Sequence, residues 1–167
     1  MKILIFLHGT IIMHKNGLDK SREERVKQVL SDDNSIHDFL NYIPIGKSYE
    51  KLKIWVKQEV EIFYLSSNQL LDDINKDLFV LRKYEFPKGK LLYRKNGQSY
   101  KDIAEEIIPD ILIEDNCESI GGTAEMVYPN MSSLIKKQVK SIVLKEFEGI
   151  DKLPTNVEDL KDWYKIV

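Results

Sequence analysis

The chain has 167 residues, of which 43% are hydrophobic and 31% are charged. These values are typical of a globular protein, and we expect one compact domain over residues 1–167. The net charge is −2, because 25 Lys and Arg residues face 27 Asp and Glu residues. A charge so close to zero gives no reason to expect nucleic acid or an anionic membrane as a partner.

The opening apolar run, Ile3 to Leu7, is too short to span a bilayer, and no cleavage pattern of a signal peptide follows it. The single cysteine, Cys117, excludes an intramolecular disulfide and a cysteine-based zinc site. We therefore expect a cytoplasmic protein that does not associate with membranes.

The first third of the chain alternates between strand and helix patterns. Residues 3–7 form a continuous apolar run, as expected of a strand that is covered on both faces. Helices are predicted at 18–30, 35–42 and 48–58, and in the last of these Leu52, Trp55 and Val56 recur at helical spacing.

The alternation continues to the end of the chain. Further strands are predicted at 61–65, 90–93, 110–115 and 141–144, with helices at 69–81, 99–107 and 157–163. Ser99 and Asp102 have the spacing of a capping box at the start of one helix. Repeated strand–helix alternation favours an α/β fold with a parallel sheet.

Polar side chains follow three of the predicted strands. His8, Gly9 and Thr10 follow the first, Ser66 and Ser67 follow the strand at 61–65, and acidic residues follow the strand at 110–115. Ligands bind at the carboxyl ends of parallel strands, so these groups are predicted to meet in one crevice.

The strand ends resemble the motifs of the haloacid dehalogenase (HAD) superfamily. Its first motif is an apolar strand followed by Asp-x-Asp-Gly-Thr, and here Gly9-Thr10 is intact while Phe6 and His8 replace the two aspartates. Ser66, or Ser67 in an alternative register, matches the second motif, and Lys101 is the best placed candidate for the third. The resemblance covers nearly the whole chain and implies a three-layer, Rossmann-like parallel sheet with a small helical cap inserted at about residues 12–42.

The fourth motif is an apolar strand that ends in acidic residues, matched here by Glu114, Asp115 and Glu118. The resemblance implies that these carboxylates hold Mg²⁺ and that Gly9, Thr10, the serines and Lys101 hold phosphoryl oxygens. Phe6 has no lone pair for attack and no charge for a metal, so the aspartyl-phosphate mechanism is not expected. Mg²⁺ is accordingly only a weak expectation.

Several site residues have two interpretations. His8 can serve as a general acid, base or nucleophile, with Asp115 in support, or it can simply hydrogen-bond within the turn. Ser66 and Ser67 can be nucleophiles if His8 is within reach, although such serines more often hydrogen-bond a phosphate or the backbone. The acidic residues can bind a metal or order the loop that follows. His14 and His37 are predicted to lie on the surface.

Three functions remain open. The first is a catalytically silent HAD-like domain that binds a phosphorylated or anionic small molecule, or a protein partner. The second is a phosphatase-like hydrolase with altered chemistry that uses His8 as base or nucleophile. The third is a structural or interaction module. The short cap predicts an open site, which would favour large ligands.

Overall fold

The computed structural model describes residues 1–163, and its centre is a five-stranded parallel sheet in the order β5-β4-β1-β6-β7. The strands are β1 (Lys2–Phe6), β4 (Glu61–Leu65), β5 (Lys90–Leu92), β6 (Ile111–Asp115) and β7 (Lys140–Leu144). All five of these strands were predicted from their apolar runs, and the predicted α/β fold with a parallel sheet is confirmed.

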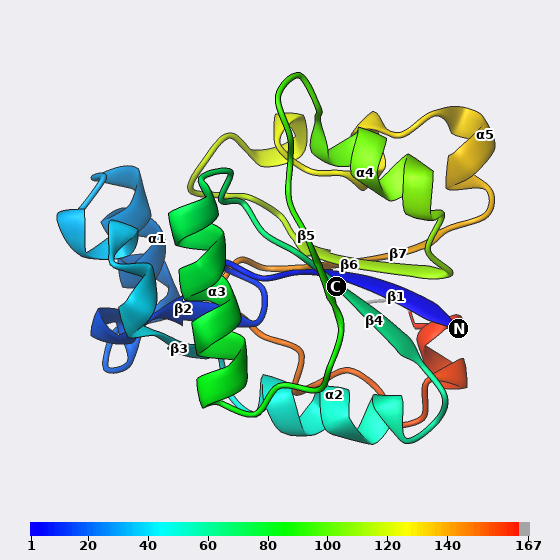
Figure 1. The fold of residues 1–167 in the computed structure, drawn as a ribbon, viewed down its shortest axis with the longest axis horizontal. Coiled ribbons are helices and arrows are strands. Elements are labelled where there is room, and N and C mark those ends of the chain that lie inside the picture. The colour runs from blue at the N-terminus through cyan, green and yellow to red at the C-terminus, as the bar shows by residue number, and fades with distance from the viewer. Residues whose placement is uncertain (164–167) are drawn as a thin grey trace.

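Helices cover both faces of this sheet (Figure 1). The α-helices of the described residues are α1 (Arg22–Leu30), α2 (Ser48–Val56), α3 (Leu71–Lys83), α4 (Tyr100–Ile107) and α5 (Ser133–Lys136). Helices α2 and α3 lie on one face and α4 and α5 on the other, which makes three layers. Alternation along β1 divides the core, because Ile3 and Ile5 pack towards α2 and α3 while Leu4 and Phe6 pack towards α4.

The capping box predicted at Ser99 is present, with the Ser99 hydroxyl accepting from the Asp102 amide and the Asp102 carboxylate accepting from the Ser99 amide. Among the described residues, no helix has the length and apolar content needed to cross a membrane.

The segment at about residues 12–42 differs from the predicted pair of helices. Its ends form a small antiparallel sheet of β2 (Ile12–His14) and β3 (Tyr42–Pro44), and α1 is its one α-helix in the described structure. The helix predicted at 35–42 is wrong, because Asn34–His37 and Phe39–Asn41 form separate 3₁₀ turns. The helix predicted at 18–30 begins later, at the capping residue Ser21.

Further 3₁₀ turns lie at Lys15–Gly17, Gly122–Ala124, Tyr128–Asn130 and Glu158–Leu160. The last of these is all that forms of the helix predicted at 157–163. The cap segment lies beyond the carboxyl ends of the strands (Figure 1), which positions it to cover them.

Candidate functional site

The ends of β1, β4 and β6 meet at a cavity of about 210 Å³. His8, Ser67 and Asp115 come from these three strand ends and all line the cavity. The structure therefore brings together one predicted residue from each motif-bearing strand. These residues are adjacent because of the strand order, in which β1 lies between β4 and β6.

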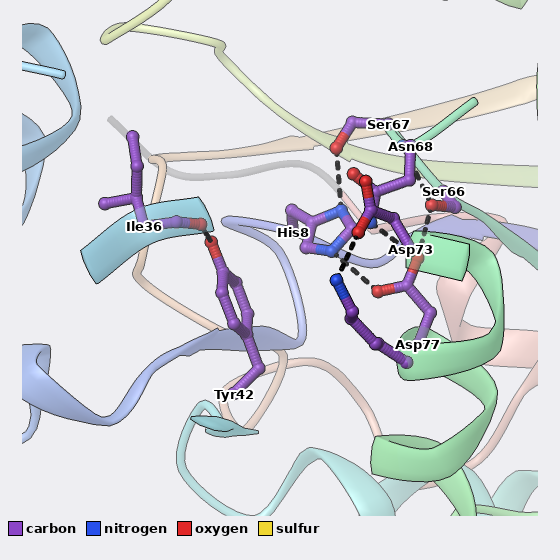
Figure 2. Close-up of polar contacts among 9 residues, drawn as sticks. His8, Ile36, Tyr42, Ser66, Ser67, Asn68, Asp73 and Asp77 are labelled. Atoms are coloured by element: carbon purple, nitrogen blue, oxygen red, sulfur yellow. Dashed lines mark hydrogen bonds and ion pairs between the residues drawn. The ribbon is translucent and has the colours of Figure 1, made fainter. Parts of the chain in front are cut away.

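Hydrogen bonds join a histidine network of His8, Ser66, Ser67, Asn68 and Asp77 (Figure 2). Its members His8 and Ser67 line the cavity. Ser67 Oγ lies 2.7 Å from His8 Nδ1, and His8 Nε2 lies 3.0 Å from Asp77 Oδ1. Asp77 Oδ2 accepts from the Ser66 hydroxyl at 2.5 Å and from the Asn68 amide group at 3.1 Å. Asp77 lies on α3, so its hydrogen bond with His8 joins this helix to the end of β1 and holds the imidazole in place.

The network assigns the tautomer of His8. Asp77 is an acceptor for both of its other side-chain partners, so the ring places its proton on Nε2 and donates it to Asp77. In the neutral ring, Nδ1 is then the acceptor for the Ser67 hydroxyl. A hydroxyl, an imidazole and a buried carboxylate arranged in this order have the geometry in which a base activates a nucleophile.

Phe6, the last residue of β1, lines the cavity. Its ring is buried and meets the Tyr100 ring edge-on, with centroids 5.1 Å apart. The guanidinium group of Arg94 lies over the Tyr100 ring, 4.1 Å from its centroid. An aromatic pair therefore forms part of the cavity wall next to the end of β1.

Three buried carboxyl groups, called the acidic group here, lie at the carboxyl ends of β6 and β7: Glu114, Asp115 and Glu146. Asp115 accepts from the Thr10 hydroxyl at 2.7 Å and the Cys117 amide at 2.8 Å. Burial raises the pKa of all three carboxyls, and it raises that of Glu114 to about 7. The neighbouring charge of Asp115 adds to the upward shift in the pKa of both Glu114 and Glu146.

The three carboxylates predicted as metal ligands are not brought together. Glu114 accepts from the backbone amides of Val127 and Tyr128 at 2.6 and 2.9 Å, and Glu118 pairs with Arg22 at 2.7 Å. Within residues 1–163 no three His, Cys, Asp or Glu side chains cluster as a metal site would require. The predicted ligand set of Asp115, Glu114 and Glu118 therefore does not fit Mg²⁺.

The predicted phosphate ligands also separate. Lys101 is exposed on α4 and does not line the cavity, while Ser66 is fully buried and occupied by Asp77 and the Asn68 amide. Thr10 is likewise buried and donates to Asp115. Gly9 and Ser67 remain at the cavity. The prediction that Lys101 anchors an anion in this crevice is wrong, because its position on α4 directs it to solvent rather than to the strand ends.

Three residues at or beside the cavity were missed or misplaced. Asp77 falls on the buried stripe of α3 between Ile74 and Val80, and a charge on an apolar stripe was the available signal. Glu146 follows β7, so the strand-end rule applied to the last strand would have found it. His14 was predicted to lie on the surface, but it is 6% exposed and lines the cavity.

The cap contributes part of the cavity wall. Met13, His14, Val29, Phe39 and Tyr42 form cavity walls from this segment. The antiparallel pair β2–β3 folds the cap back towards the strand ends, and the open site for large ligands stays a prediction.

No protein-family model and no curated protein matches the sequence. The structure resembles the class C acid phosphatase from Bacillus anthracis, with a TM-score of 0.56 and 15% identity over 89% of this chain and 67% of the phosphatase. The tungstate-bound form of that phosphatase gives the same TM-score at 14% identity, over 89% of this chain and 68% of the phosphatase.

A chain of the Pnkp1/Rnl/Hen1 RNA repair complex gives a TM-score of 0.51 and 15% identity over 86% of this chain. This protein spans only 43% of that chain's length. Such low identities show a shared fold alone, and that fold is the HAD-like arrangement that the strand-end motifs predicted.

Proposed function

We propose that this HAD-like protein binds a small molecule in the cavity beneath its cap and does not form an aspartyl-phosphate. The observation that carries the proposal is the pair of aromatic rings of Phe6 and Tyr100 at the cavity wall. A phenyl ring can neither attack phosphorus nor bind a cation through a lone pair. It does supply apolar contact area, which is the predominant lining of small-molecule sites.

The charges around the cavity bear on the phosphorylated ligand that the fold and the phosphatase neighbours suggest. Asp115 and Glu146 line the wall, whereas Arg25 already donates to the carbonyl of Gly17 at 2.7 Å. Carboxylates repel a phosphate, and the predicted anchor Lys101 does not reach the cavity. The proposal therefore favours an uncharged ligand over a phosphorylated one.

A thermal-shift screen of uncharged and phosphorylated metabolites tests the binding. A ligand at about 100 times its Kd stabilises the folded state by about 2.7 kcal/mol. The matched variants are Val29→Phe, which fills the cavity from α1, and Leu30→Phe, which changes the exposed neighbouring residue. We expect Val29→Phe to abolish the shift and Leu30→Phe to retain it.

A shift that survives Val29→Phe would contradict binding in this cavity. No shift with any compound would contradict the proposal itself and would favour the predicted protein partner, which size-exclusion chromatography of a captured complex would then detect.

Phosphatase activity is tested with p-nitrophenyl phosphate, with and without Mg²⁺. We expect no turnover above that of a Phe6→Ala control. Turnover by the wild-type protein that requires Mg²⁺ would contradict the proposed loss of phosphatase chemistry.

The contact between Ser67 and His8 favours a second candidate function, a serine hydrolase acting on acyl esters. In that reaction Ser67 Oγ would bond to the acyl carbon as its proton passes to His8 Nδ1, and the leaving alcohol would take that proton as its bond breaks. Water would then release the acid and restore the hydroxyl. A fluorophosphonate probe tests this directly, since its attachment to Ser67 is read by intact mass and lost in Ser67→Ala. An unlabelled wild-type protein would contradict this second function.

A further inference from the structure

The cavity has an aromatic wall. Phe6, Phe39, Tyr42, Tyr100 and Phe147 all line it, and they come from both the sheet side and the cap side. Flat rings stack favourably on such side chains in offset or edge-on arrangements. The wall therefore favours a planar ligand over a flexible chain.

The size of the cavity limits that ligand. A cavity of about 150 Å³ in another protein accommodates benzene. The present cavity, of about 210 Å³, is larger than that cavity but smaller than twice its volume. It therefore suits a molecule of one or two fused rings.

His14 lines the cavity, and one nitrogen of its ring has no hydrogen-bond partner in the described structure. Its Nδ1 accepts from the Asn16 amide at 3.2 Å, so in the neutral ring the proton lies on Nε2. Burial lowers the pKa of His14, which favours that neutral form. Nε2 is buried and has no hydrogen-bond partner in the described structure. Because a buried donor without a partner is costly, an acceptor brought by a ligand would be favoured there.

The charged groups at the wall point to a neutral ligand. Asp115 and Glu146 are hydrogen-bond acceptors, and each already receives a hydroxyl, from Thr10 and Ser119 respectively. Their carboxylates retain further lone pairs for an N–H group. Arg25 is held by the cap backbone at Gly17 and so is not free for an anion.

We propose that the cavity binds a neutral, planar nitrogen heterocycle of one or two rings, whose ring nitrogen accepts a hydrogen bond from His14 Nε2. The inference rests on the proposed binding function and adds the chemical class of the ligand. His14 is the residue that discriminates, because it separates a ring that carries an acceptor nitrogen from a ring of equal size that lacks one.

Benzimidazole and indole are the matched probes, since both are flat bicyclic molecules with one N–H and differ by one ring nitrogen. Isothermal titration calorimetry measures the Kd of each. We expect the wild-type protein to bind benzimidazole about fivefold to tenfold more tightly than indole, as one neutral hydrogen bond would give.

His14→Phe keeps a buried ring and removes the donor. In this variant we expect the ratio of the two dissociation constants to fall to about one while indole still binds. Leu30→Phe is the control, because Leu30 is exposed and does not line the cavity. It should leave the ratio unchanged.

Equal affinity for both probes in the wild-type protein would overturn the role of His14 while leaving cavity binding intact. A ratio that persists in His14→Phe would do the same. If neither probe binds but another compound in the thermal-shift screen does, the ligand class is wrong and the binding function stands. If nothing binds at all, both proposals fail.

Discussion

The buried carboxylate of Asp77 in the histidine network and the buried carboxylates of the acidic group are stabilised differently. In the histidine network, Asp77 accepts from three side chains, those of His8, Ser66 and Asn68. In the acidic group, the carboxylates accept from hydroxyls and backbone amides, and those of Asp115 and Glu146 both lie beside Gly9. A Cβ built on Gly9 would meet Asp115 Oδ2 at 3.0 Å and Glu146 Cγ at 3.2 Å.

This difference predicts that the histidine network keeps a fixed geometry, whereas the protonation of the acidic group changes with pH. A carboxylate that receives three donors is held in one geometry, and it fixes the donors in turn. Neighbouring carboxyls that are buried without a cation are easier to protonate, and the raised pKa values of Glu114, Asp115 and Glu146 show this. One side of the site is therefore expected to be rigid and the other to depend on pH.

The largest effect is expected from removing the centre of the histidine network. Asp77→Ala leaves His8, Ser66 and Asn68 without their shared acceptor in a buried region, and we expect it to lower the free energy of unfolding by about 3–5 kcal/mol. Urea denaturation measures the loss. Asp77→Asn keeps one acceptor oxygen and should cost clearly less; equal losses in the two variants would contradict a network held by acceptance at Asp77.

The next effect is a pH dependence that arises in the acidic group. The pKa of Glu114 rises from 4.5 to about 7 on folding, so the folded state binds the proton more tightly than the unfolded state does. Stability is then greatest below pH 4.5 for this group and falls as the pH rises towards 7. Because a difference of one pKa unit corresponds to about 1.4 kcal/mol, Glu114 alone would change the free energy of unfolding by up to about 3 kcal/mol. Denaturation midpoints at pH 5 and pH 8 measure this change.

Glu114→Gln is the control for that dependence, since its amide cannot titrate. We expect the variant to show a smaller loss of stability between pH 5 and pH 8, with the remainder contributed by Asp115 and Glu146, whose pKa values are also raised. A variant with the full wild-type pH dependence would show that the titrating group lies elsewhere.

The sheet was predictable from the sequence, and the cap was not. Strands such as Glu61–Leu65 are apolar runs with clear polar ends, and that pattern depends only on neighbours in the chain. Strands β2 and β3 have three residues each, too few for a period to be recognised, and their pairing joins residues about thirty positions apart. The cap was therefore predicted as helices, and His14 was predicted to lie on the surface.

The site was predictable to the level of strand ends. The positions of His8, Ser67 and Asp115 followed from the parallel sheet, since their strands are neighbours. Lys101 failed because motif order gives a place along the chain but not the face of a helix, and on α4 the buried face belongs to Ile103 and Ala104. Asp77 was missed because its partner His8 is 69 residues away, and no local pattern pairs them.

Gly9 tests how tightly the acidic group is packed. Its φ of +77° is unfavourable for a side chain, and an added Cβ would come within 3.0 Å of the Asp115 carboxylate. We expect Gly9→Ala to lower the free energy of unfolding by about 2 kcal/mol, from backbone strain and this close contact together. Thermal unfolding of Gly9→Ala beside Gly97→Ala separates the two terms, because Gly97 has a φ of +80° with nothing within 4 Å of its added Cβ. Equal losses would leave only the backbone term.

The smallest effects distinguish two adjacent serines, either of which fits the second HAD motif by sequence. Ser66 is fully buried, donates to Asp77 and accepts from the Asn68 amide, so Ser66→Ala removes two hydrogen bonds and should cost about 1–2 kcal/mol. Ser67 forms a hydrogen bond with His8 at the part-open cavity wall, so Ser67→Ala should cost less than about 1 kcal/mol. Ligand affinity should reverse this order, because Ser67 reaches the cavity and Ser66 does not. Paired urea denaturation and calorimetry on the two variants measure both quantities. If Ser66→Ala instead weakened binding more than it weakened folding, the hydroxyl that faces the ligand would be Ser66, and the register of the motif would shift by one residue.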